Sequence, residues 1–189
     1  MTHEEARDLM ASAWETRRRA FGVAPEKKRE LLGRAREELK RALARCQDDG
    51  TPVLRAQALH LLANVESDLG NPEPARALWE ESVSILRGTD DTLQLAHKLR
   101  HLGDLHRRCR RPDEAEVHYV EALELYRAQE DPGSLGVANA TRSMAALVES
   151  RGDTERALEL WRETRDLYAA VEVAEGVAEA QGRIDRLSN

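Results

Sequence analysis

The chain is poor in the residues from which sheets and aromatic cores are built. It has one Phe, three Tyr and three Trp among 189 residues, and β-branched side chains are scarce. A sheet would need such residues. Ala, Leu, Glu and Arg dominate instead, and all four are good helix formers. A core with so few aromatic rings must pack Leu against Ala between close helices, so these absences predict an all-α fold.

Long apolar runs and cysteine clusters are also missing. No run approaches the roughly 20 apolar residues that a membrane span needs, and the first residues, MTHEEARDLMASAW, lack the apolar core of a signal peptide. Cys46 and Cys109 have no CxxC spacing, which is typical of unpaired cysteines in a reducing compartment. We therefore predict a cytoplasmic protein with no membrane partner and no structural disulfide.

Positive charge is not in excess, because the formal net charge is −6. Nucleic-acid-binding domains are generally basic, and the arginines of this chain are not interleaved with aromatic residues on which bases would stack. We therefore expect no nucleic-acid partner.

The most informative feature that is present is an internal repeat. Three alanines, Ala75, Ala115 and Ala157, are spaced 40 and then 42 residues apart. An aromatic residue follows each alanine by four, a small residue follows it by seven, and another alanine precedes it by 19; these residues are Trp79, Tyr119 and Trp161, then Ser82, Ala122 and Thr164, then Ala56, Ala96 and Ala138. A small residue that faces a bulky one lets two helices approach closely, so each unit is predicted to be a helical hairpin.

Turn signals divide the chain at regular places. Within units they lie at 70–72, 111–113 and 152–154, and between units at 50–52, 88–90 and 131–133. Pro72 and Pro112 suit the first turn of a helix, while Asn71 and Asp153 suit its N-cap. We predict nine helices in one solenoid domain, 1–189, whose parts are a degenerate hairpin at 1–50, repeats at 52–88, 92–128 and 134–170, and a capping helix at 173–187.

These residues resemble the tetratricopeptide repeat, which places Leu-Gly in its first helix, Gly-Asp at the turn, then Ala, an aromatic residue four later and another Ala. Leu102-Gly103, Gly152-Asp153 and the set Ala115, Tyr119 and Ala122 carry the resemblance. The period near 40 is similar to the long-repeat variety of kinesin light chains and many bacterial signalling regulators. The resemblance implies a right-handed superhelical solenoid whose first helices line a concave groove that binds a partner.

Carried over position by position, the resemblance implies a polar groove on the first helices. Its residues would be Gln57, His60, Asn64, His97, Arg100, His101, Asp104, Arg107, Arg108, Asn139 and Arg142. Residues 92–111 hold six Lys or Arg residues and one acid, Asp104. Arginine suits bidentate pairing with carboxylates, so an acidic peptide is one interpretation. The other is a solvated helix face whose arginines pair with neighbouring acids.

Metal and catalytic sites are weaker interpretations. His97, His101 and Asp104 share one helix face and would suit Zn²⁺, but six His in 189 residues produce such spacing by chance. Cys109 lies three residues after His106, and an unpaired cysteine is more often a packing residue than a nucleophile. We therefore expect no metal, no cofactor and no enzymatic activity.

Two functional hypotheses remain. The first is a scaffold or adaptor that binds a partner protein, and the second is a regulatory sensor that binds a small peptide or metabolite and acts through a separate effector. A homo-oligomer is also possible through the end helices, where Trp14 and Phe21 would supply apolar surface.

Overall fold

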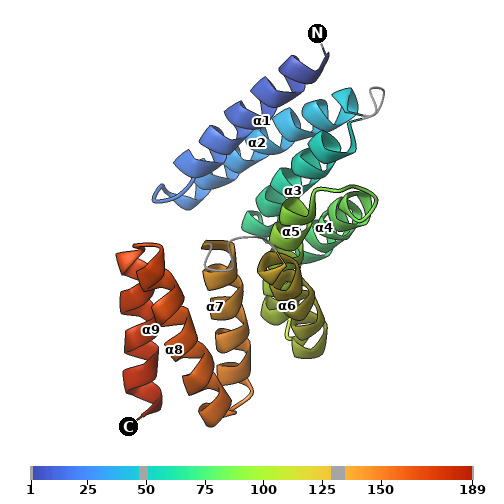
Figure 1. Cartoon of the computed structure of the whole chain (residues 1–189). Helices are drawn as coiled ribbons and strands as arrows, with labels where there is room; N and C mark the ends of the chain where they lie inside the picture. The colour runs from blue at the N-terminus through green and yellow to red at the C-terminus, as the bar shows by residue number, and fades with distance from the viewer. Residues whose placement is uncertain (1, 47–50, 129–134, 189) are drawn as a thin grey trace. The chain divides into compact units, whose positions relative to one another are not determined.

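The protein is all-α, as its composition predicts. The computed structural model describes residues 2–46, 51–128 and 135–188, and these residues form nine helices paired in hairpins, with no strand (Figure 1). They belong to two compact units, Met1–Asp91 and Thr92–Asn189. The prediction of nine helices is confirmed, whereas the single domain stays a prediction.

The first unit contains two helical hairpins. Helix α1 (Thr2–Arg19) pairs with α2 (Pro25–Arg45), and α3 (Pro52–Asp68) pairs with α4 (Pro72–Leu86). Helix α2 also packs against α3. The core of this unit is built from alanines and long aliphatic side chains, among them Met10, Leu32, Ala35, Leu39, Leu54, Ala58 and Val65. The predicted turn at 50–52 begins outside the described residues.

The second unit contains two hairpins and a final helix. Its five helices are α5 (Thr92–Arg108), α6 (Pro112–Arg127), α7 (Leu135–Ser150), α8 (Thr154–Ala170) and α9 (Ala174–Leu187). Each helix packs against the next, and α5 also contacts α7 directly. The predicted turn at 131–133 lies outside the described residues. The first helices of successive repeats are therefore neighbours within this unit.

The helix ends show which turn predictions hold. Pro72 and Pro112 each begin a helix, as predicted. The Asp153 side chain accepts a hydrogen bond from the backbone N–H of Arg156 at 3.1 Å, which confirms it as an N-cap. Asn71 is at the N-cap position of α4, as predicted, but its side chain makes no capping bond; its amide donates to Glu66 Oε2 at 2.7 Å instead. The nearby carboxylate of α3 competes successfully for this side chain.

Two of the three turns inside the repeats use glycine, and one uses arginine. Gly70 and Gly152 have φ angles of +85° and +81°, in the left-handed region. Arg110 occupies the corresponding turn between α5 and α6 with a φ of +58°. This conformation costs a residue that has a Cβ atom about 1–2 kcal/mol, so the α5–α6 turn stores backbone strain that the other two turns avoid.

The repeat alanines and aromatic residues are the centre of the hairpins. Ala75, Ala115 and Ala157 are fully buried, and so are Trp79, Tyr119 and Trp161. Cys46 is buried and Cys109 is half-buried, and these two cysteines form no disulfide with each other. Among the described residues, no helix is long and apolar enough to cross a membrane.

Candidate binding face of the first helices

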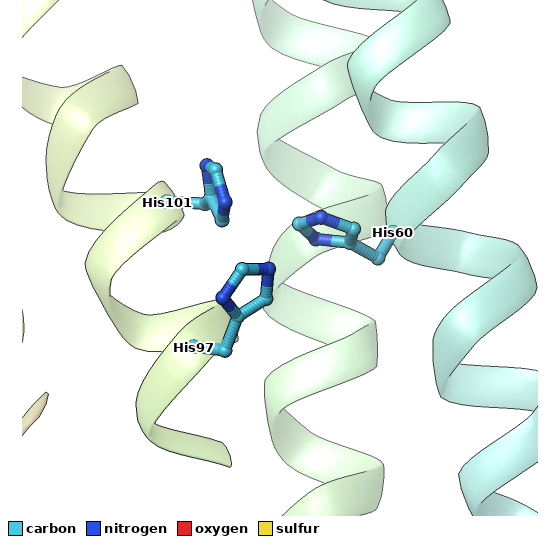
Figure 2. A group of neighbouring side chains, drawn as sticks. All are labelled: His60, His97 and His101. Carbon is cyan, nitrogen blue, oxygen red and sulfur yellow. The ribbon is translucent and has the colours of Figure 1, made fainter. Parts of the chain in front are cut away.

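The predicted groove residues all lie on first helices of hairpins, but in unequal environments. In the first unit, Gln57 and Asn64 are half-buried on α3. His60, also on α3 (Figure 2), is only 5% exposed. Its Nδ1 accepts a hydrogen bond from Trp79 Nε1 at 3.1 Å. His60 therefore fixes the aromatic residue of its own hairpin.

Asp104 has the corresponding task in the second unit. Its Oδ1 accepts hydrogen bonds from the Tyr119 hydroxyl at 2.7 Å and from Ser143 Oγ at 3.1 Å. Its Oδ2 accepts from Arg100 Nη1 at 3.1 Å. Burial, together with the Asp104 charge, raises the pKa of Tyr119, so its hydroxyl keeps the proton that it donates. One carboxylate thus joins α5, α6 and α7.

Arg100 is a buried part of this cluster. The whole residue is 8% exposed, and its second terminal nitrogen, Nη2, lies 2.8 Å from His101 Nε2. A buried guanidinium needs a paired acid, and Asp104 supplies it. The structure therefore gives Arg100, which the resemblance placed in the groove, a packing and pairing role.

Glu149 on α7 repeats the arrangement one hairpin later. Its Oε2 accepts from Trp161 Nε1 at 2.8 Å, and its Oε1 accepts from Arg183 Nη1 on α9 at 2.9 Å. In each of the three repeat hairpins, then, the aromatic residue of the second helix donates to a polar acceptor on the first. Glu149 is a functional residue that was not predicted from the sequence. The sequence feature that indicates this role is a polar residue that lies 12 to 19 positions before each repeat aromatic residue.

Two tyrosines, also missed, join successive repeats. A Cβ atom added to Gly136 would lie 2.5 Å from the Tyr126 ring, and one added to Gly176 would lie 2.5 Å from the Tyr168 ring. The Tyr168 hydroxyl also donates to Asn139 Oδ1 at 2.8 Å. The signal in the sequence is two tyrosines 42 residues apart, each followed by a glycine within ten residues.

Two of the three candidate zinc ligands, His97 and His101, lie close together on α5. His97 and His101 lie one turn apart (Figure 2), with ring centroids 4.6 Å apart in an edge-to-face arrangement. Burial, with the charges of Lys98 and Arg100, lowers the pKa of His97 to about 4, and burial with the charge of Arg100 lowers that of His101 to about 2. The rings are therefore neutral at pH 7.

Their surroundings nevertheless disfavour a cation. The guanidinium of Arg100 hydrogen-bonds the Nε2 atom of His101, so an ion at this atom would meet a positive charge. The third predicted ligand, Asp104, already accepts hydrogen bonds from three side chains. The zinc interpretation gains no support from α5.

Among the predicted groove residues of the second unit, the accessible cations are at the end of α5 and on α7. Arg107 is half-buried and Arg108 is exposed, both in the last turn of α5, where positive charge complements the helix dipole. Arg142 is half-exposed on α7, and both Glu179 carboxylate oxygens are 3.4 Å from its Nη1. That distance exceeds the 2.7–2.9 Å of a strong charge-assisted bond, so this ion pair is weak.

Comparison with known sequences identifies the same repeat. A family model described as tetratricopeptide repeat matches residues 94–170, and a second model with that description matches residues 55–88. Protein KINESIN LIGHT CHAIN-RELATED 1 of Arabidopsis thaliana is 29% identical over 206 aligned positions. The alignment covers 82% of this chain and 32% of that protein, so the chain spans about a third of its relative.

Solved structures share the fold at low identity. The apo form of RapI has a TM-score of 0.81 and 15% identity, and the match covers 94% of this chain and 60% of that one. BtubC (BKLC) from P. vanneervenii has a TM-score of 0.64 and 18% identity, with 100% and 91% of the two chains covered. At these identities the likeness concerns the architecture alone.

Proposed function

Because the chain belongs to the tetratricopeptide repeat family, whose domains generally bind other proteins and are typically non-catalytic, we propose that it is a non-enzymatic adaptor. It binds an acidic segment of a partner protein on the α5–α7 face, which consists of His97, Arg107 and Arg108 on α5 with Asn139 and Arg142 on α7. Arg100 and Asp104 lie beneath this face and hold its helices together.

The observation that carries the proposal is the difference between Arg100 and Arg142. The two residues occupy the same position of successive repeats, 42 residues apart. Arg100 is buried against Asp104, whereas Arg142 is half-exposed and contacts Glu179 only at 3.4 Å. A guanidinium so placed can exchange a weak internal partner for a ligand carboxylate and form two parallel hydrogen bonds with it.

Local charge supports an acidic partner. The chain as a whole has a formal charge of −6, but residues 107–111 contribute four arginines and no acid. This local positive charge, opposite in sign to the net charge of the chain, attracts an acidic segment over a distance of about 10 Å at moderate ionic strength. Complementary charge of this kind raises association rates and selects the partner more than it adds affinity.

The test is a capture experiment with a charge-matched control. Wild type and the variant Arg108→Glu/Arg142→Glu are immobilised, and proteins captured from a lysate of the source organism are identified by mass spectrometry. The control is Arg41→Glu/Arg162→Glu, because both of these arginines are exposed and lie on second helices. We expect one partner to be lost from the first variant alone, with helicity unchanged in all three proteins.

A captured partner is then mapped to an acidic segment, and a synthetic peptide of that segment is titrated by calorimetry. Binding should weaken steeply as salt is added. Equal capture by both variants would refute the α5–α7 face as the binding site. Failure of the wild type to retain any protein would instead favour the second hypothesis, a regulatory sensor for a small peptide or metabolite.

A further inference from the structure

The turn between α1 and α2, in the first unit, is an uncharged apolar tip. Its residues, 20–25, read Ala-Phe-Gly-Val-Ala-Pro and contain no polar side chain. Phe21 is 54% exposed and Val23 is 40% exposed. A lone exposed apolar residue is common on protein surfaces, so the meaning of these two depends on what surrounds them.

The tip projects past the neighbouring hairpin of the same unit. Helix α2 begins ten residues before Ala35, which lies 40 residues before Ala75, whereas α4, α6 and α8 each begin three residues before their repeat alanine. The difference of seven residues (ten minus three) lengthens α2 by about 10 Å. Arg17, three residues before the tip, donates to Asp68, the last residue of α3, at 2.6 Å. A hairpin of ordinary length therefore ends at the level of Arg17 and leaves the tip uncovered.

Basic residues flank the tip on both sides. Residues 15–30 hold six cations and three acids, although the net charge of the whole chain is −6. Asp68, which pairs with Arg17, adds a fourth acid, so the region keeps an excess of two positive charges (six minus four). The six cations are Arg17, Arg18 and Arg19 before the tip and Lys27, Lys28 and Arg29 after it.

The acids of this region leave half of these cations available. Glu15 pairs with Arg18 at 3.1 Å, and Glu30 pairs with Lys27 at 2.8 Å. Glu26 lies in the first turn of α2, where the helix dipole favours an acid. Within the described part of the chain, no acid lies within ion-pair distance of the remaining three cations, Arg19, Lys28 and Arg29.

We propose that the α1–α2 tip binds the surface of an anionic lipid bilayer. Phe21 and Val23 enter the boundary between headgroups and acyl chains, and the flanking cations contact the lipid phosphates. Stable binding to a membrane surface takes two such signals, an inserted apolar group and a basic patch, and aromatic rings favour this depth. A contact of this kind needs no spanning helix, so it departs from the expectation of no membrane partner.

The apolar half of the tip favours lipid over nucleic acid. A single strand would use the cations and could stack a base on an aromatic ring, but it gains little from Val23. The Phe21 ring already has cations over it: the guanidinium carbon of Arg17 lies 5.4 Å and Lys28 Nζ lies 5.8 Å from its centroid. A bilayer accommodates both the apolar side chains and the charges. The tip belongs to the first unit, so it is independent of the α5–α7 face.

Flotation of the full chain with lipid vesicles tests the proposal. The vesicles contain phosphatidylcholine alone or phosphatidylcholine with about 30% phosphatidylserine, which supplies the negative surface. In about 0.1 M salt we expect wild type to float with the anionic vesicles and to stay unbound with the neutral ones. Raising the salt to about 0.5 M should release most of the bound protein, because the charges are then screened.

The two signals are separated by two double variants. Phe21→Ser/Val23→Ser should weaken binding about tenfold or more, because no side chain then enters the apolar layer. Its control is Val117→Ser/Val120→Ser, which replaces two valines of α6 that are 64% and 42% exposed. The control should bind as wild type does.

The charge variant is Arg19→Glu/Arg29→Glu. It should weaken binding about 25-fold or more, since each basic residue near an anionic surface contributes about fivefold. Arg41→Glu/Arg162→Glu changes the net charge equally at exposed positions outside the tip and should stay close to wild type. All of these residues are exposed, so the helicity should be unchanged in every variant.

A wild type that does not float with the anionic vesicles overturns the proposal. Undiminished binding of both tip variants, or equal losses in the tip variants and their controls, overturns it as well. If only the arginine variant loses binding, the apolar residues do not enter the bilayer and the inserted tip is refuted. Binding of a fluorescent single-stranded oligonucleotide that depends on the same arginines, without any vesicle binding, would assign the tip to nucleic acid instead.

Discussion

Replacing Asp104 with alanine tests whether the polar cluster around this residue stabilises the packing of α5, α6 and α7 (a structural clip) or forms part of a ligand site. The Asp104 carboxylate accepts from Tyr119, Ser143 and Arg100, which belong to three helices. Asp104→Ala leaves all three donors without this acceptor. Tyr119 is 0% exposed, Ser143 is 3% exposed and Arg100 is 8% exposed, so water replaces the lost bonds poorly.

The size of the loss follows from this burial. Removal of one member of a buried ion pair costs about 3–5 kcal/mol, mostly because the remaining charge is stranded. The Asp104 side chain is itself 22% exposed, so water can enter and relax part of the penalty. We expect the lower end of the range, about 3 kcal/mol, which for a chain of this length lowers the melting temperature by about 6–12 °C.

The assay is urea and thermal unfolding followed by circular dichroism. Asp104→Asn should fall between wild type and Asp104→Ala, because it keeps one acceptor oxygen but loses the charge. Asp166→Ala is the control: this carboxylate is 69% exposed, and its removal should change stability by less than about 0.5 kcal/mol. If Asp104→Ala stays within about 1 kcal/mol of wild type, the clip interpretation is refuted and Asp104 becomes a candidate ligand contact.

Three further predictions follow from the turns, the close contacts and the histidines. Arg110→Gly should stabilise the chain by up to about 1 kcal/mol in urea unfolding, because it relieves a positive φ; a loss of stability would contradict the strain argument. Gly136→Ala should destabilise it by about 1–3 kcal/mol, because the new methyl group would lie 2.5 Å from the Tyr126 ring; an unchanged melting temperature would show that this ring yields. Burial lowers the pKa of His97 and His101 to about 4 and about 2, so the unfolded chain binds their protons first as pH falls below about 6.5. Wild type should therefore lose more stability between pH 7 and pH 5.5 than the double variant with glutamine at both positions, and equal losses would exclude this linkage.

The architecture followed from the sequence because it depends on spacing. The alanine and aromatic positions recur at 40 and 42 residues, and such a period is compatible with few structures other than stacked helical hairpins. The turns were harder to predict. Asn71 and Asp153 occupy equivalent positions, yet only Asp153 caps its helix, because Glu66 captures the Asn71 side chain. A carboxylate five residues away decides whether the Asn71 side chain caps its helix. N-cap propensity alone does not predict that contact.

The candidate site was less predictable because one repeat position can serve several purposes. His60, Arg100 and Arg142 occupy the same place in three first helices, 40 and 42 residues apart. His60 accepts a hydrogen bond from Trp79, and Arg100 neutralises the Asp104 carboxylate that accepts from Tyr119. The sequence shows three polar residues at one position and does not show which of them the packing already uses.

The acceptor chosen by each repeat aromatic decides which first-helix residue remains accessible. In the third repeat, Trp161 donates to Glu149, seven residues after Arg142, and Arg183 of α9 balances that carboxylate. Arg142 is therefore not needed to pair with it, and it stays half-exposed with a loose contact to Glu179. An acceptor at the position of Glu149 leaves the guanidinium of Arg142, about two helical turns before it, without this pairing task. The acceptor to which each repeat aromatic residue donates thus explains the buried hydrogen-bond cluster at Asp104. It also explains why Arg142 is the accessible cation that α7 contributes to the α5–α7 face.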